Sequence, residues 1–433
     1  MDIELLYFIL IIGVFIVCAV VFKLPTGIAM LFSALAGGIA YAITAPYQFL
    51  QLPRHLIDGS FGYIDPIITI AAAMIYMKVI ERAGTLDKFS VAVLKKLHKW
   101  PTLLLLAFMF IIMFPAMITG SSVTSVVSSG ALVAPMMLAI GIPKKETTAI
   151  VASGAVCGMI APPINIPVMI ICDIVDMPYI GFMLPLLILI LPLAIFFVLY
   201  LGRKHIKKID IKALEDKVNF NIENEVKWPV YIPLVLLIVL LVFVNFFPQI
   251  LPPFGTPLVF IIAALPGFFV GRKVNLIAST KEAIRVALPV MAMLMGIGML
   301  VQIMTLNGVR GYVVYNVMTL AQTTWGRHPL LLYLGAAIFI PLFGSISPLA
   351  SASVFGGPVV MSLIFMNPII VASALSLLAS VGDFLPPSAI AGQTSARVVG
   401  VDRYVSVLPK LIVPIIVTII YSVAYMIVLG LYY

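Results

Sequence analysis

The sequence predicts an all-α polytopic membrane protein made of two inverted repeats, each with five membrane crossings. Three observations predict this fold class: an apolar composition, a one-sided distribution of basic residues, and a recurring pattern of glycine, serine and proline. The composition indicates a membrane environment, because 63% of the 433 residues are hydrophobic, 10% are charged, and the mean hydropathy is +1.19. Such a chain has too few polar residues to cover a soluble domain of this size.

Eight apolar runs approach or reach the length of about 20 residues that spans a bilayer. They lie at 5–22, 26–44, 63–80, 179–202, 229–248, 256–271, 286–306 and 411–431. The first run lacks the basic flank and cleavage site of a signal peptide, so we expect it to be retained. Two further regions are too rich in Gly, Ser and Pro for simple helices, and each is expected to hold a re-entrant hairpin followed by a Pro-broken spanning helix.

These elements divide the chain into two halves, each with scaffold helices and an amphipathic arm. The first repeat is predicted at 1–202, with a hairpin at 101–140 and a broken helix at 144–176. A linker follows at 203–228. The second repeat is predicted at 229–433, with a hairpin at 329–366 and a broken helix at 368–398. The linker is the one extended charged stretch and is expected to be solvated. Because each half makes an odd number of crossings, the second copy lies upside down relative to the first.

The basic residues predict the orientation, since Lys and Arg near short loops collect on the cytoplasmic side. Placing the N-terminus outside puts 23 of the 26 Lys and Arg residues in the cytoplasm and leaves Arg54, Arg310 and Arg327 outside. We therefore expect a multi-pass protein of the cell (inner) membrane with a cytoplasmic linker. The same distribution explains the net charge of +9 without a nucleic-acid partner.

The third observation is an internal repeat with a spacing of 224 positions. Five pairs have this spacing: Gly84 with Gly308, Gly120 with Gly344, Gly158 with Gly382, Pro162 with Pro386, and Pro163 with Pro387. Five matches at one offset, in the same order, indicate a duplication. Inverted repeats with discontinuous helices are typical of secondary transporters, which bind substrate and ions near the membrane midplane. A passive channel would not require such a pair of broken helices.

The double prolines predict where polar backbone groups lie inside the membrane. Proline lacks an N–H and clashes with the preceding turn, so a Pro-Pro pair leaves several carbonyl and amide groups without helical partners. In lipid such groups are unfavourable, so they must face protein or a water-filled cavity. Freed carbonyls are ligands for a small hard cation, and freed amides at a half-helix N-terminus favour an anion.

We expect the hairpin tip and the break of each half to form one ion site, with the substrate between the two tips. The candidate residues are Gly120, Ser121, Ser122, Pro162, Pro163 and Asn165 in the first half, and Gly344, Ser345, Ser347, Asp383, Pro386, Pro387 and Ser388 in the second. Four of them are candidate Na+ ligands: Ser121, Asn165, Ser345 and Asp383. The alternative interpretation, that small residues only permit close helix packing, is preferred for isolated positions such as Gly37 and Gly38.

Asp383 is the strongest single candidate, because an aspartate near the bilayer centre costs about 2.5–3.5 kcal/mol on insertion scales. Three roles are open to it: a cation ligand, a proton carrier, or a cap of the broken helix. Met159 occupies the equivalent position in the first half, so the two ion sites cannot be chemically identical.

At these residues the chain resembles the large membrane subunit of the tripartite ATP-independent periplasmic (TRAP) transporters, DctM-like, of the ion-transporter superfamily. The resemblance covers nearly the whole chain and includes the arm after the third span, the Gly-Ser hairpin tip, the GxxxPP break and their second copies. It implies an elevator, sodium coupling, organic-anion substrates, a small four-helix membrane subunit and a secreted (periplasmic) solute-binding protein. The sequence departs from the family at Ser125 and Ser347, where an acidic residue is common, and at Leu385, where a threonine is usual.

The function expected from the resemblance is cation-coupled symport of a small carboxylate, with Na+ as the coupling ion and H+ as the alternative. The competing hypothesis is a stand-alone sodium- or proton-coupled organic-anion carrier of the same superfamily, which needs no binding protein. Neither hairpin contains an arginine, so Arg397 is the nearest candidate to hold a carboxylate, unless it is a cytoplasmic anchor. No enzymatic activity and no cofactor are expected, because SVGD at 380–383 only partly matches the GxGD element of intramembrane proteases.

Overall fold

The computed structural model describes residues 2–206, 227–247, 255–322, 329–363 and 365–432, and across these ranges the chain is helical without a strand. Seven helices within them are long and apolar enough to cross a membrane, and an eighth span results if the bent pair Phe49–Phe61 and Ile64–Ala83 counts as one. The prediction of an all-α polytopic membrane protein is therefore confirmed. Most of the predicted linker, residues 207–226, lies outside the described residues.

Both halves of the described chain consist of successive helices. In the first half they are α1 Ile3–Ile16, α2 Thr26–Thr44, α3 Leu52–Phe61, α4 Ile64–Ala83, α5 Thr85–Leu97, α6 Pro101–Thr119, α7 Ser122–Ser125, α8 Ala131–Ala139, α9 Lys144–Ile160, α10 Ile166–Ile174 and α11 Met183–Gly202. In the second half they are α14 Ile232–Phe246, α15 Thr256–Ala264, α16 Leu276–Leu306, α17 Val309–Gln322, α18 Pro329–Gly344, α19 Pro348–Ser351, α20 Gly357–Ser362, α21 Pro368–Val381, α22 Ile390–Val399 and α23 Leu408–Tyr432.

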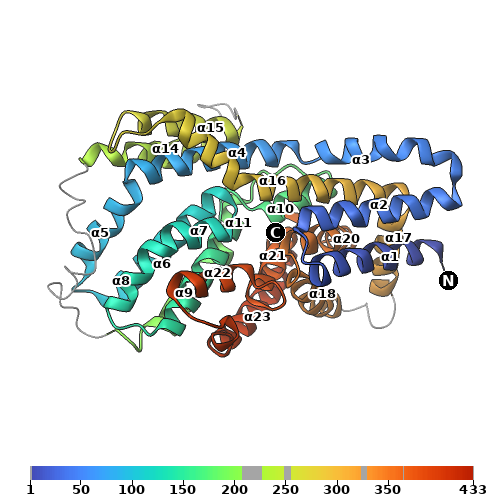
Figure 1. Ribbon diagram of the computed structural model, residues 1–433. Helices are drawn as coiled ribbons and strands as arrows, with labels where there is room; N and C mark the ends of the chain where they lie inside the picture. The colour runs from blue at the N-terminus through green and yellow to red at the C-terminus, as the bar shows by residue number, and fades with distance from the viewer. Residues whose placement is uncertain (1, 207–226, 248–254, 323–328, 364, 433) are drawn as a thin grey trace.

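Two hydrophobic cores divide the molecule, and each core draws on both halves of the sequence. One core joins α1–α4 to α14–α17, which we call the scaffold layer, and it also takes in side chains of the tips and of α10, such as Ile118, Ile166 and Leu349. The other joins α6–α11 to α18–α23, which we call the hairpin body. In Figure 1 the helices α2, α3, α4, α14, α15 and α16 form an elongated layer along the top, and the hairpins and broken helices lie beneath it. The last spans of the halves, α11 and α23, pack within the hairpin body.

The two broken helices match at the predicted spacing. The first begins with α9 at Lys144 and the second with α21 at Pro368, which is 224 positions later. The half-helices that follow the breaks, α10 and α22, begin at Ile166 and Ile390 with the same separation. The two broken helices therefore share their boundaries, while the duplication itself stays a prediction.

The hairpins match at a spacing of 226, so the prediction of 224 throughout is wrong for them. Ser121 and Ser347 both act as N-caps, and each side chain accepts a hydrogen bond from the amide three residues later. A π-helical segment follows each cap, at Val126–Gly130 and at Ala352–Gly356. The sequence aligns Gly120 with Gly344, whereas the structure aligns the capping serines, so the path from tip to break is two residues longer in the first half.

The two halves interlock through their broken helices. The half-helix α10 of the first half packs against α21 and the π-helical segment of the second half. Conversely, α22 of the second half packs against α9 and the π-helical segment of the first half. Each break is therefore surrounded by elements from both repeats.

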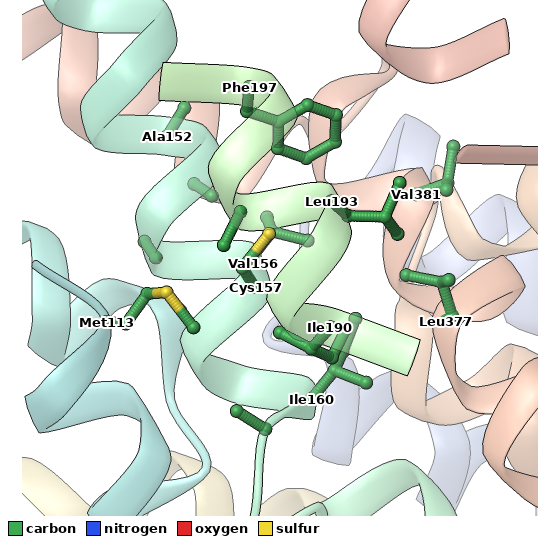
Figure 2. Packing of buried hydrophobic residues seen from close by; sticks show 14 of the residues in the cluster. Met113, Ala152, Val156, Cys157, Ile160, Ile190, Leu193, Phe197, Leu377 and Val381 are labelled. Atoms are coloured by element: carbon green, nitrogen blue, oxygen red, sulfur yellow. The ribbon is translucent and has the colours of Figure 1, made fainter. Parts of the chain in front are cut away.

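Helix α9 lies at the centre of the hairpin body, because small residues let its neighbours approach from several sides. Figure 2 shows Ala152, Val156 and Cys157 of α9 among Met113 from α6, Leu193 and Phe197 from α11, and Leu377 and Val381 from α21. Every residue of α9 from Glu146 to Ile160 is buried. Because protein surrounds this helix on all sides, it can end at a break whose backbone groups lack helical partners, and those groups do not meet lipid.

Candidate functional site

The first hairpin tip begins where α6 ends. Gly120 adopts a left-handed conformation with φ of +64°, which favours glycine and terminates the helix. A side chain at this position would collide with Ile164 and Ile166 just after the first break. Ser121 then caps α7, since its hydroxyl oxygen accepts a hydrogen bond from the Thr124 amide at 3.3 Å. The first tip therefore lies directly against the first break, as predicted for this half.

A glycine before each proline pair lets a hairpin helix cross the broken helix in backbone contact. A Cβ on Gly158 would overlap the carbonyl oxygen of Met113 in α6, and a Cβ on Gly382 would overlap the carbonyl of Gly344 at the end of α18. The GxxxPP pattern therefore has a packing role as well as a role in breaking the helix. The glycine brings each hairpin tip up to the break, and the prolines free the backbone groups there.

Asp383 meets the tip of the other half. Ser122 of the first tip donates a hydrogen bond from its hydroxyl to Oδ2 of Asp383 at 2.8 Å. Both side chains are buried, with Asp383 2% exposed. Among the described residues, no basic side chain forms an ion pair with this carboxylate. The prediction that tip and break pair within one half therefore does not hold for Asp383, which joins the two halves.

Ser388 pairs within its own half, as predicted. Its hydroxyl donates to the carbonyl oxygen of Ser345 at 2.5 Å, and its backbone N–H donates to the same oxygen at 3.1 Å. The Ser345 hydroxyl donates to the carbonyl of Leu342, which it caps. Ser347 serves as the N-cap of α19 through the Ala350 amide. The second tip is thus fixed to the second break through the backbone of Ser345.

Asn165 is a buried junction between the halves. Its side-chain amide nitrogen donates to the Ile160 carbonyl at 2.8 Å and to the Ser376 hydroxyl in α21 at 3.1 Å. Its side-chain oxygen accepts from the Val168 amide at 3.0 Å and caps α10. Of its hydrogen-bonding capacity, only one acceptor position on that oxygen is left for a cation. Asn165 is therefore first a structural bridge and cap, and can contribute at most one ligand oxygen.

Two tyrosines that the sequence analysis did not identify satisfy backbone groups at the breaks. The Tyr179 hydroxyl donates to the carbonyl of Pro163 at 3.1 Å and accepts from the Asn165 amide at 3.2 Å. The Tyr404 hydroxyl donates to the carbonyl of Phe384 at 2.8 Å. The signal was present in the sequence, because the two tyrosines are 225 positions apart and each follows its proline pair by a similar distance.

We expect Tyr404→Phe to destabilise the protein by about 1–3 kcal/mol, because it leaves the buried Phe384 carbonyl without its donor. The check is the midpoint of thermal unfolding of the purified protein in detergent. Tyr315→Phe is the matched control, since the Tyr315 side chain is 69% exposed and its loss of a hydroxyl should leave the midpoint unchanged. Equal midpoints for both variants would show that the Tyr404 hydrogen bond does not hold the second break.

Three more hydroxyls are buried in the hairpin body. Ser129 is on the first π-helical segment, Ser153 on α9 and Ser395 on α22, and these three elements pack against one another. Each hydroxyl oxygen is buried without a hydrogen-bond partner among the described residues. The interior of the hairpin body therefore contains hydroxyl groups that are left without a partner by the described helices around them.

The fold and this site define a polytopic membrane transporter with hairpin tips set against broken helices. The family profile of the tripartite ATP-independent periplasmic transporters, DctM component, matches residues 12–431. The chain therefore belongs to the DctM family and is a TRAP-type secondary transporter component.

Two solved structures have the same fold at low sequence identity. One is MtrF of Neisseria gonorrhoeae, described within a class of antimetabolite efflux pumps, at 12% identity and a TM-score of 0.63, with 88% of this chain and 85% of that chain covered. The other is the YdaH transporter of Alcanivorax borkumensis, at 15% identity and a TM-score of 0.60, with 90% of each chain covered. These likenesses concern the fold alone. Among curated proteins, none matches the sequence.

Proposed function

We propose that this chain imports a small organic acid by cation-coupled elevator transport, as the large membrane subunit of a tripartite system. The observation that carries the proposal is the buried Asp383 carboxylate, held by Ser122 from the other half and paired with no described basic side chain. An uncompensated charge inside the membrane is unfavourable. Binding of a cation beside it is therefore favourable, and an inward gradient of that cation would drive uptake.

Coupling follows from the place of Asp383 between the two repeats. The first tip reaches this carboxylate through Ser122, and the second tip is fixed to the same break through Ser388 and Ser345. A cation at Asp383 would neutralise the site and hold both tips in a closed arrangement around the substrate. We expect Na+ as the coupling ion, with oxygen ligands from Ser121, Asn165, Ser345 and Asp383, and H+ carried by the Asp383 carboxyl as the alternative.

The two hydrophobic cores support an elevator. Most of the hairpin body packs around its own core, so it can move as a unit. The tip and break side chains that pack on the scaffold layer, such as Ile166 and Leu349, would then slide along it. In the proposed orientation the N-terminus is outside and the linker is cytoplasmic, in an inner membrane. The proposed partners are a small four-helix membrane subunit and a periplasmic solute-binding protein that delivers the organic acid.

The test is uptake of a panel of labelled organic acids into proteoliposomes under an imposed Na+ or proton gradient. It is done with this chain alone and with the small subunit and binding protein added. We expect accumulation of at least one acid that stops when the gradient is dissipated. Uptake by the chain alone would favour the stand-alone carrier, whereas equilibration without accumulation under either gradient would contradict coupled transport.

A further inference from the structure

A large cavity separates the scaffold layer from the second tip and break. Its volume is about 820 Å3. One wall consists of the turn between α1 and α2, around Lys23–Gly27, together with Pro289 and Ala292 of α16. The other wall consists of Ile346 of the second tip, Pro387 and Ser388 of the break, and one face of α22. The cavity therefore ends at Ser388, whose hydroxyl donates to the carbonyl of Ser345 in the second tip.

The charges in this cavity are all of one sign. Arg397 and Lys23 line opposite walls, and no acidic residue is among the lining residues. Arg397 is exposed, and within the described part of the chain its guanidinium has neither an acidic partner nor a hydrogen bond. A basic pair in a cavity bounded by apolar walls creates a positive potential that concentrates anions.

Two polar side chains of α22 line the cavity, Gln393 and Arg397, and the Gln393 amide also donates to the Pro387 carbonyl at 3.4 Å. Gln393 and Arg397 are four residues apart, so both side chains lie on the same side of the helix. A guanidinium matches a carboxylate with two parallel hydrogen bonds, which gives orientation as well as affinity. Ile346, Ile390 and Ala292 are among the apolar lining residues and offer a surface to the rest of a bound molecule.

The backbone on both walls is held in a rare conformation. Lys23 has φ of +53° and Ala389, between the lining residues Ser388 and Ile390, has φ of +40°. Left-handed conformations at residues other than glycine are strained and cluster at active sites and ligand clamps. Of the three such residues in the described chain, two therefore lie beside this cavity.

We propose that this cavity binds the carboxylate of the transported acid through Arg397, with the apolar body of the acid against Ile346 and Ile390. The proposal rests on the proposed transport function and identifies its specificity-determining residue. Lys23 also attracts the anion, but it lies on the scaffold wall. It therefore stays in place when the hairpin body, including α22, moves. The site therefore selects organic acids that carry at least one carboxylate and an apolar portion.

The first test is chemical and needs no transport. The purified chain in detergent is treated with the arginine reagent phenylglyoxal, in the presence of benzoate or of neutral benzamide, and modification is located by mass spectrometry. We expect benzoate to slow the modification of Arg397 about 10-fold, because benzoate at a concentration well above its Kd occupies the cavity in most molecules. Benzamide should leave the rate of modification unchanged. Arg403 is the internal control. Equal modification of Arg397 with both compounds would overturn the proposal.

The second test measures uptake kinetics. Arg397→Gln should raise KM for an organic acid about 10- to 100-fold, the range for a lost charged hydrogen bond, with a smaller change for Arg397→Lys and none for Arg403→Gln. An unchanged KM in Arg397→Gln would refute the role of Arg397 and leave coupled transport intact. Conversely, protection by benzoate in a chain that transports no acid would leave the anion site standing and reject the proposed function.

Discussion

Asp383→Asn is expected to reduce cation-driven uptake about 100-fold, the order of a lost charged interaction, while the protein stays folded. The amide oxygen of asparagine can still accept the hydrogen bond from Ser122, so the junction between the halves remains. What disappears is the negative charge that attracts the cation. The unfolding midpoint should be equal to or higher than that of the wild type, because an uncompensated buried charge has been removed.

The measurement compares initial uptake rates and unfolding midpoints for the wild type, Asp383→Asn and Asp402→Asn. Asp402 is exposed and lies beyond α22, so its substitution should change neither quantity. Uptake that remains gradient-driven at the wild-type rate in Asp383→Asn would make Asp383 a helix cap only. Loss of uptake specifically under a proton gradient, with sodium-driven uptake retained, would identify the carboxyl as a proton carrier.

Gly382→Ala is expected to destabilise the protein by about 1–3 kcal/mol or more and to abolish uptake. The added Cβ would overlap the Gly344 carbonyl, so α18 and the second break would have to separate, and overpacking of this kind is costly in a closely packed core. Separation would also move Ser345 away from Ser388, whose hydrogen bonds fix the second tip.

Gly335→Ala in α18 is the matched control, because no atom lies within 4 Å of an added Cβ there. In that variant we expect unchanged uptake and an equal or slightly higher unfolding midpoint, since alanine favours a helix over glycine. If Gly382→Ala is too unstable to purify, Gly158→Ala tests the same crossing in the first half. Wild-type stability and uptake in both glycine variants would contradict the assigned role of the GxxxPP glycine.

Much of the site could be predicted from the sequence because its residues break the local rules of membrane helices. A proline pair, a Gly-Ser tip and an intramembrane aspartate are each unfavourable in a continuous apolar span, so their positions stand out. The start of each broken helix also follows from the repeat, as Lys144 and Pro368 illustrate. These features depend only on neighbouring residues, so they can be recognised in a single sequence.

The contacts between the halves could not be predicted in the same way. Ser122 and Asp383 are 261 positions apart, and Asn165 and Ser376 are 211 positions apart. The repeat pattern alone does not say whether a tip meets its own break or the other one. Tyr404 was missed for a different reason, because tyrosines near span ends usually mark the membrane interface and its hydroxyl gave no sign of its backbone partner.

In the proposed elevator, the second tip faces the two sides of the membrane alternately. Ile346→Cys, in a chain whose buried Cys18, Cys157 and Cys172 are replaced by alanine, places a thiol on the tip beside the cavity. A membrane-impermeant maleimide is applied from either side of oriented vesicles, with and without the coupling cation and an organic acid. We predict that the accessible side changes when the gradient is reversed. Labelling from one side alone under every condition, while the variant still transports, would contradict the account.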